Sequence, residues 1–268
     1  MQGLNLHRGQ LMLSVNKSHK AILLNTLNEQ NAENTASAFA IENPFGENII
    51  VTCASLVKAN PYPVFKFWKS PYIQTEFSTL KYGLLKTIPM GHYGELFKSE
   101  QTNDIIDIQQ NINLAFFRAT ELKEDFPILS IQHHEDDLSY VEMHGHTCPE
   151  SYKLPKQPYV VTGTYIQDHN CGYILNASKQ VYSDMLGAPV LNAKGNVVAV
   201  VSKVITHLPE SYVLKQLSTG QTKRYCLAKT SKEESNVHPY TVSALCTPVS
   251  EIVHYMNKYL CKVDESLQ

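Results

Sequence analysis

The sequence lacks the features that mark membrane-spanning and secreted proteins. No apolar run in its 268 residues reaches the about eighteen residues that a membrane-spanning helix needs. Near the N-terminus only short apolar stretches occur, at residues 11–13 and 21–24, without the continuous hydrophobic region or small-residue cleavage site of a signal peptide. We therefore expect a soluble protein of the cytoplasm or nucleus, without a membrane partner.

An excess of charge of either sign is also missing. The chain has 23 Lys and Arg against 25 Asp and Glu, a formal net charge of −2 at pH 7. This balance gives no long-range attraction for phosphate backbones or anionic lipids. Tyr212, Tyr225 and Tyr240 lie in or beside a lysine-containing region, a pattern that can bind single-stranded nucleic acid. Tyrosine is also ordinary in barrel cores and interfaces, and we expect no nucleic-acid partner.

Cysteines are few and scattered. The chain has six, none of them in a Cys-x-x-Cys motif: Cys53, Cys148, Cys171, Cys226, Cys246 and Cys261. In a chain without a secretion signal this distribution predicts reduced thiols rather than a disulfide framework. We expect no cofactor.

One segment concentrates residue types that bind metal ions. It comprises residues 133–137, His-His-Glu-Asp-Asp, followed by His144, His146 and Cys148. On a strand the last three would share one face, a geometry that suits zinc. A solvated acidic loop followed by a strand end with incidental histidines explains the same residues. We assign no metal ligand and keep these three as the residues to test.

Short β-rich runs recur along the chain, many at a spacing of about eight to twelve residues and separated by Gly, Pro and Asn, as in all-β sandwiches and barrels. The clearest runs are residues 37–42, 48–57, 64–68, 112–117, 140–143, 159–165, 172–175, 196–204, 225–229 and 240–245. Only residues 248–260 have helical spacing of apolar residues, with a proline in the first turn. A hydrophobic fraction of 43% is enough for a sizeable core. The sequence predicts an all-β protein with a C-terminal α-helix.

The chain divides into two β-rich halves. Residues 119–137 between them are rich in Glu and Asp, as in a linker. We place the boundary near residue 125, which gives an N-terminal unit of residues 1–125 and a C-terminal unit of residues 126–268.

Three regions carry motifs in a fixed order. Residues 36–41 read Ala-Ser-Ala-Phe-Ala-Ile, and after a turn at Gly46 residues 49–57 read Ile-Ile-Val-Thr-Cys-Ala-Ser-Leu-Val. Residues 113–118 read Asn-Leu-Ala-Phe-Phe-Arg. Residues 182–192 read Tyr-Ser-Asp-Met-Leu-Gly-Ala-Pro-Val-Leu-Asn and precede a turn at Gly195 and an apolar run.

Together these motifs resemble the trypsin-like serine peptidases of the Deg/HtrA type, the intracellular and disulfide-free branch of that family. The corresponding family motifs are Gly-x-Gly-Phe-x-Ile, Ile-Leu-Thr-Ala-Ala-His-x-Val, Asp-Leu-Ala-Leu-Leu-Lys and Gly-x-Ser-Gly-Gly-Pro-Leu-Val-Asn. Ala36 and Ala38 stand where the first motif has glycines. The resemblance implies one trypsin-like unit of two packed six-stranded antiparallel β-barrels, followed by the C-terminal helix.

The residues that carry catalysis in this family are replaced. In the family a serine attacks, a histidine takes its proton and an aspartate orients the histidine. The matching positions are Leu186, Ser55 and Asn113, none of which can take these roles. Asp184 stands at a glycine position of the oxyanion hole, where its carboxylate would repel a developing negative oxygen. We predict a catalytically inactive homologue.

The resemblance also implies a cleft in which an extended peptide pairs with the strand after the nucleophile loop, here around residues 200–204, without needing a triad. The predicted cleft residues are Asp184, Met185, Leu186, Gly187, Val200, Val201 and Ser202. We expect the partner to be a protein or an extended peptide, and the oligomeric state stays open.

Two alternatives remain beside this interpretation. The first is an active serine-type endopeptidase with a rearranged catalytic constellation, for which Ser183, Cys53 and Ser55 are the nearest nucleophile candidates. The second is a purely structural component that docks through its barrels and has no peptide cleft.

Overall fold

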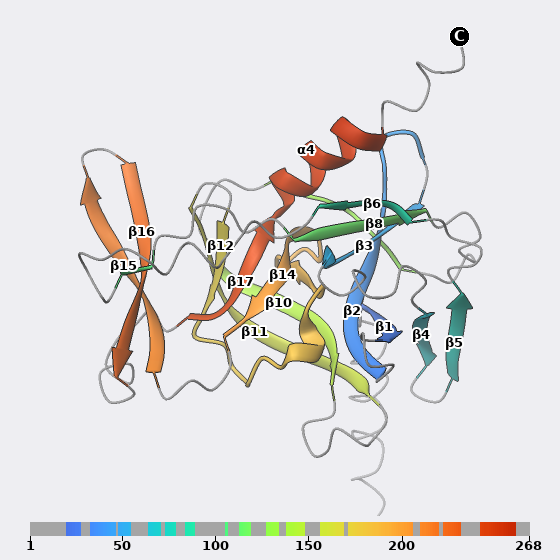
Figure 1. The fold of residues 1–268 in the computed structure, drawn as a ribbon, viewed down its shortest axis with the longest axis horizontal. Coiled ribbons are helices and arrows are strands. Elements are labelled where there is room, and N and C mark those ends of the chain that lie inside the picture. The colour runs from blue at the N-terminus through green and yellow to red at the C-terminus, as the bar shows by residue number, and fades with distance from the viewer. Residues whose placement is uncertain are drawn as a thin grey trace, which may run out of the picture.

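The computed structural model is built mainly of β-strands (Figure 1). It describes residues 20–27, 33–46, 48–54, 64–70, 73–78, 84–88, 105–106, 113–118, 127–133, 138–147, 156–168, 171–205, 210–219, 222–231 and 242–260. Among these residues, no helix has the length and apolar character needed to cross a membrane.

The N-terminal half forms an eight-stranded sheet. Its order is β5 (Ile73–Ser78), β4 (Val64–Ser70), β1 (Ile22–Leu27), β2 (Glu33–Glu42), β3 (Asn48–Thr52), β8 (Leu114–Arg118) and β6 (Leu84–Ile88), and β9 (Ile128–Leu129) pairs with β2 off this path. The pairing of β9 with β2 is parallel, and the other pairings of this sheet are antiparallel. The described strands follow an open path from β5 to β6, so the predicted barrel of this half stays a prediction.

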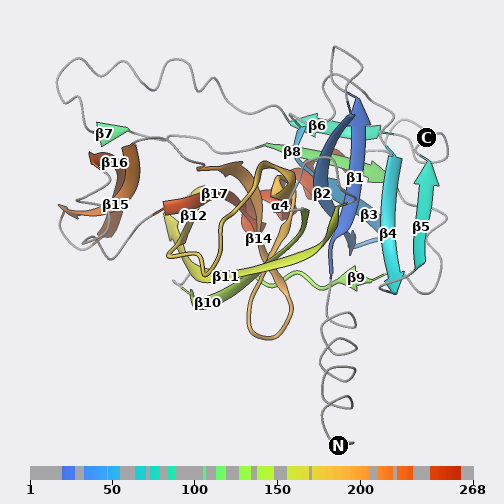
Figure 2. The same cartoon turned by 90° about the horizontal axis from the view of Figure 1, so that it is seen from below.

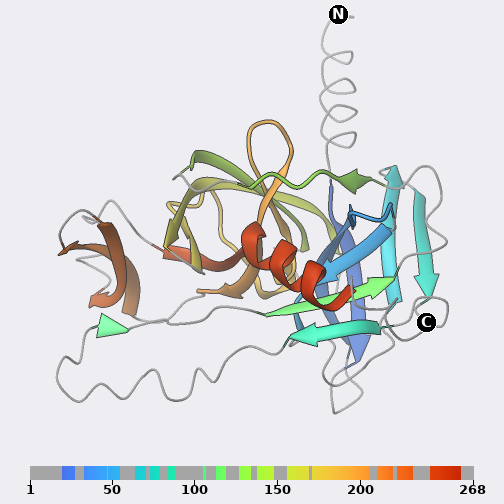
Figure 3. The same cartoon turned by 90° about the horizontal axis from the view of Figure 1, so that it is seen from above.

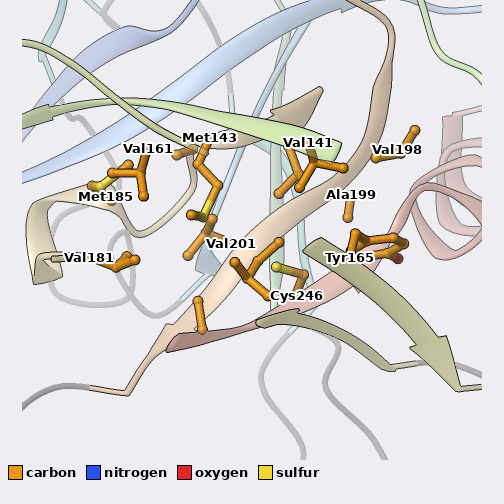
Figure 4. Packing of buried hydrophobic residues seen from close by; sticks show 14 residues of the cluster. Val141, Met143, Val161, Tyr165, Val181, Met185, Val198, Ala199, Val201 and Cys246 are labelled. Carbon is orange, nitrogen blue, oxygen red and sulfur yellow. The ribbon is translucent and has the colours of Figure 1, made fainter. Parts of the chain in front are cut away.

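The C-terminal half closes into a six-stranded barrel, as predicted. Its order is β10 (Leu138–Thr147), β11 (Gln157–Asp168), β12 (Cys171–Leu175), β17 (Val242–Pro248), β14 (Val197–Val204) and β13 (Pro189–Leu191), all antiparallel. Buried side chains such as Met143, Tyr165 and Val201 pack together inside it (Figure 4). The short alternating runs of the sequence thus become strands whose apolar faces share one interior.

A long hairpin projects beyond the barrel, on the side away from the N-terminal sheet (Figures 1 and 2). It consists of β15 (Glu210–Thr219) and β16 (Thr222–Ser231), and β7 (Ile105–Ile106) pairs with β16. The sequence predicted only residues 225–229 of this sheet as a strand. Tyr212 and Tyr225 belong to the hairpin, and Tyr240 lies outside the described residues.

The C-terminal helix α4 (Val249–Leu260) confirms the expected helix and lies against the junction of the two halves (Figure 3). Its buried residues Val249, Ile252 and Met256 join one hydrophobic core with residues of both halves. The other members of this core are Phe39, Ile41, Ile49, Val51, Leu114, Phe116, Leu129, Leu191, Val197 and Val200. Because the helix comes from the C-terminal half and packs on strands of the N-terminal half, the two halves share a core.

The segment after β9 also joins the halves. Ile131 pairs in parallel with Val197 of β14. The Val197 N–H donates to the Ser130 oxygen at 2.8 Å, and the Gln132 N–H donates to the Val197 oxygen at 3.0 Å. Residues 127–133, which follow the boundary predicted near residue 125, are therefore hydrogen-bonded to both halves.

Candidate functional site

The motif positions for the orienting residue and the nucleophile lie at the junction between the N-terminal sheet and the barrel. Asn113, just before β8, donates its Nδ2 hydrogen to the Ser202 oxygen of β14 at 3.2 Å. The Gly187 N–H, next to Leu186, donates to the oxygen of the adjacent Val201 at 2.9 Å. Asn113 and Gly187, the residue after Leu186, are thus bonded to Ser202 and Val201, which are consecutive residues of β14. Ser55 lies outside the described residues.

The turn that carries Leu186 has its own internal hydrogen bonds. The 3-10 helix η1 (Ser183–Met185) places Leu186 at its C-terminal cap. The Leu186 N–H donates to the Ser183 oxygen at 3.1 Å. In a serine peptidase the N–H of the nucleophile residue must point at the developing oxyanion. Here that N–H is turned back into the chain.

Asp184 anchors this turn to three other elements. Its carboxylate accepts hydrogen bonds from the Thr35 hydroxyl of β2 at 2.7 Å and from the Thr147 hydroxyl of β10 at 3.1 Å. Lys156, just before β11, places its Nζ 2.8 Å from the same carboxylate. The sequence predicted only that Asp184 would disturb an oxyanion hole. In the structure it is a clamp between β2 and the barrel.

Ser37 is a second contact point, one that sequence reasoning missed. Its N–H donates to the Leu186 oxygen at 2.8 Å, and its hydroxyl donates to the Asp184 oxygen at 3.0 Å. Its carbonyl accepts the Thr52 hydroxyl at 2.8 Å. The one signal in the sequence was its position between Ala36 and Ala38, where the family has glycines. Three elements of the junction, β2, β3 and η1, therefore meet with Leu186 through backbone and hydroxyl groups.

Gly187 is required by this arrangement. Its φ is +80°, a conformation that L side chains rarely adopt. A Cβ atom at this position would collide with the carbonyl oxygen of Ser37 and would lie 2.5 Å from the Thr52 hydroxyl. Backbone conformation and packing together explain the glycine after position 186.

Cys53, one of the displaced-nucleophile candidates, is a buried structural thiol. It has no exposed surface, and its S–H donates to the Val201 oxygen at 3.1 Å. Burial raises the pKa of the thiol to about 12, against a smaller opposite effect of a hydrogen bond from the Gly187 backbone. Since the thiolate is the reactive form, Cys53 is not a nucleophile at neutral pH. Ser183, by contrast, is exposed at the start of η1.

The predicted metal candidates do not form a metal site in the part of the chain that the structure describes. His144 and His146 are buried on β10, and Cys148 lies outside the described residues. His144 Nε2 is 2.9 Å from a carboxylate oxygen of Glu142, and its Nδ1 accepts the Lys20 N–H at 3.3 Å. Both ring nitrogens of His144 are therefore committed to the protein itself. Burial, and to a smaller extent His144, lowers the pKa of His146 to about 3.

The predicted cleft residues are mostly buried at the same junction. Met185, Gly187, Val200, Val201 and Ser202 are buried, and Asp184 and Leu186 are half-buried. The Val201 N–H donates to the Ala188 oxygen at 2.9 Å, and the Val201 oxygen accepts the N–H of Gly187. The main chain of β14 at this point is already paired within the protein.

The end of β14 differs from this paired part. Pairing with β13 ends at Val200, which faces Pro189. The Ile205 N–H donates to the Ser243 oxygen at 3.0 Å, toward β17. Because successive residues of a strand point their main-chain groups to opposite edges, those of Val204 point to the edge that β13 has left. Among the described strands, none pairs with β14 on this side at Val204.

Comparison with known proteins gives no family assignment. No protein-family model and no curated protein matches the chain. Among solved structures, the apo MamO protease domain from Magnetospirillum magneticum is similar, with a TM-score of 0.48 and 13% identity over 89% of this chain and 96% of that chain. The HtrA-type protease AlgW with a tripeptide has a TM-score of 0.45 and 11% identity, over 82% of this chain and 59% of that chain. Both TM-scores are below 0.5, so we infer the function from the geometry of the junction.

Proposed function

We propose that the chain is a non-catalytic relative of the trypsin-like serine peptidases that binds a protein or an extended peptide. The hydrogen bond from the Leu186 N–H to the Ser183 oxygen supports the loss of catalysis most directly. It removes an oxyanion donor at the position where the motif has already lost its nucleophile. Loss of one such donor costs about 10²- to 10³-fold in rate in an active enzyme.

The side chains around this position support the same proposal. Asn113 and Cys53 both donate to carbonyl oxygens of β14, and the Asp184 carboxylate is bound by Thr35, Thr147 and Lys156. Peptidases without a triad keep only about 10³- to 10⁴-fold acceleration over water, through the oxyanion hole and substrate binding. With the 186 N–H turned inward, this remainder is lost as well. The catalytic junction has become a structural clasp between the two halves.

Binding needs none of these groups. An extended segment that pairs with the free edge at Val204 would gain main-chain hydrogen bonds, and pockets for its side chains would give selectivity. Leu186 is half-buried and the adjacent Met185 is buried, so apolar side chains stand where the peptidase motif has its nucleophile. Cys53, Cys171 and Cys246 are buried and not joined in disulfides, which supports a reducing compartment such as the cytoplasm or nucleus.

A peptide-display selection against the full chain, followed by calorimetric titration of the selected peptide, tests the binding role. Val204→Pro removes the main-chain N–H at the free edge and should weaken binding about tenfold or more, since Pro is tolerated at strand edges. Val204→Ala keeps the N–H and is the matched control, with near-native affinity expected. Leu186→Asp should weaken binding because it replaces an apolar side chain with a charged one.

The outcomes separate the alternatives. Affinity that survives both Val204→Pro and Leu186→Asp would exclude this cleft and favour docking through another surface of the barrels. Cleavage of the selected peptide by the wild-type chain would favour the active endopeptidase. The proposal requires binding without cleavage.

A further inference from the structure

A chain of hydrogen bonds runs from the surface of β10 to the start of β1. The Tyr140 hydroxyl donates to Glu142 Oε1 at 2.6 Å, and Glu142 Oε2 lies 2.9 Å from His144 Nε2. His144 Nδ1 accepts the Lys20 main-chain N–H at 3.3 Å. These residues alternate along β10, so their side chains share one face.

The partners fix the protons on the His144 ring. A main-chain N–H can only donate, so Nδ1 must carry a lone pair and accept from Lys20. The single proton of the neutral ring then sits on Nε2 and donates to the Glu142 carboxylate. The Tyr140 hydroxyl donates to the other oxygen of this carboxylate, so both carboxylate oxygens of Glu142 accept a hydrogen bond.

The contact between His144 and Lys20 lies directly before the start of β1. Its side chain is 2% exposed, whereas Tyr140 is 47% exposed. Lys20 directly precedes Ala21 and Ile22, which are fully buried at the start of β1. The Lys20 N–H contact is therefore a tie between β10 of the barrel and the segment that leads into the N-terminal sheet.

We propose that His144 is a proton-operated latch that holds Lys20 and Ala21, the described residues before β1, against β10 when neutral and releases them when protonated. A second proton must go on Nδ1, the atom that accepts the Lys20 N–H. Two donors would then face each other at hydrogen-bond distance, and the contact with Lys20 would be lost. The bond to Glu142 would be kept and strengthened as an ion pair, so the ring would stay while the segment leaves.

The groups around the ring set the direction of this switch. Burial lowers the pKa of His144, the nearby Lys20 charge acts the same way, and the Glu142 carboxylate partly opposes them. His146 is the other titratable neighbour on β10. Opposite residues 142–144, β11 contributes Thr162, Val161 and Val160, and β13 contributes Leu191 and Val190. Asp184 of η1 forms its ion pair with Lys156 next to Thr147, at the opposite end of β10 from Glu142. The latch is therefore closed at neutral pH and opens on acidification.

Hydrogen exchange of the full chain, read residue by residue by NMR, tests the proposal. After correction for intrinsic exchange, the amides of Lys20, Ala21 and Ile22 should exchange about tenfold or more faster at about pH 5 than at about pH 7.5. Amides of β12 and β17 should keep their protection over the same range. In His144→Asn, whose Oδ1 replaces Nδ1 as acceptor, this pH dependence should disappear. In Glu142→Gln the opening should move to lower pH, because the carboxylate that favours the second proton is gone.

Three results would overturn the latch. One is equal protection of Lys20 and Ala21 at both pH values in the wild type. Another is the same acid-induced loss in His144→Asn. The third is a loss of protection in β12 and β17 together with β1, since that would be global acid unfolding and not a local release.

Discussion

Asn113 and Ser202 are joined across the junction of the two halves, because the Asn113 Nδ2 donates a 3.2 Å hydrogen bond to the Ser202 oxygen. Asn113 has no exposed surface, and Ser202 is almost completely buried. An aspartate at position 113 would present a carboxylate to this carbonyl oxygen, whereas asparagine presents a donor. Asparagine at this motif position thus makes a structural contact that aspartate could not make.

Asn113→Asp introduces the aspartate of the peptidase motif, yet it should destabilise the protein. A buried carboxylate that faces the Ser202 carbonyl oxygen in place of the amide donor costs about 3 kcal/mol in the free energy of unfolding at neutral pH. Burial raises the pKa of such a carboxyl, so the loss should shrink as pH falls and the group is protonated. Urea denaturation at about pH 7.5 and about pH 5 measures both effects. Asn113→Ala, which loses the hydrogen bond without gaining a charge, is the control and should lack the pH dependence.

Gly187→Ala should be more destabilising than Gly195→Ala. Both glycines have a φ of +80°, so both variants carry the same backbone strain, of about 1 kcal/mol. A Cβ at Gly187 would strike the Ser37 carbonyl, whereas a Cβ at Gly195 meets nothing within 4 Å. The difference between the two free energies of unfolding isolates the packing of η1 against β2. Equal losses would contradict the contact between Gly187 and Ser37.

Asp184→Gly restores the residue that the family has at this position, yet it should weaken the fold. The variant loses the contacts to Thr35, Thr147 and Lys156, at a cost of about 1–3 kcal/mol. Asp184→Asn keeps an acceptor and should lose less. Thermal denaturation ranks the two variants. A more stable Asp184→Gly variant would show that the carboxylate is not a clamp.

Acidification should lower the free energy of unfolding. The pKa of His146 is about 3 in the folded protein, against an ordinary value of 6.5, so the unfolded chain binds more protons between these values. The stabilisation from the neutral ring is complete above pH 6.5 and is lost as pH falls toward 3. The slope is up to about 1.4 kcal/mol per pH unit for each buried histidine. Denaturation between about pH 7.5 and about pH 5.5 measures this slope before most carboxylates titrate.

A variant separates this effect from other titrations. His146→Leu should lower the slope of the unfolding free energy against pH by the contribution of one proton, up to about 1.4 kcal/mol per pH unit. This change in slope is expected whatever the stability of the variant at neutral pH. An unchanged slope in a folded His146→Leu variant would mean that His146 is accessible to protons in the native state.

The parts of the fold that sequence reasoning predicted are those with strong local signals. The apolar spacing over α4 and the alternating runs of β11, β14 and β17 gave recognisable patterns. The strands β9 and β13 are two and three residues long, too short to leave a pattern, and they exist through pairing with distant strands.

The site was predictable only in part for the same reason. Asn113 and Leu186, which motif order assigned to one site, lie at one junction in the structure. The partners of Asp184 come from residues 149 and 37 positions away in the chain, so no local motif could reveal the clamp. Ser37 acts through its main chain, which every residue type has, and through a hydroxyl that bonds to Asp184 and His146, 147 and 109 positions away. No local pattern could reveal partners this far away in the chain.

Labelling with a fluorophosphonate probe tests the central claim most directly. The full wild-type chain, incubated with the probe and analysed by intact-mass spectrometry, should show no covalent adduct, because the Leu186 N–H is bound to Ser183 and a leucine stands at the nucleophile position of the motif. The triple variant Ser55→His, Asn113→Asp, Leu186→Ser should also remain unlabelled. A stoichiometric adduct on a wild-type serine, lost when that serine alone is changed to alanine, would contradict the account.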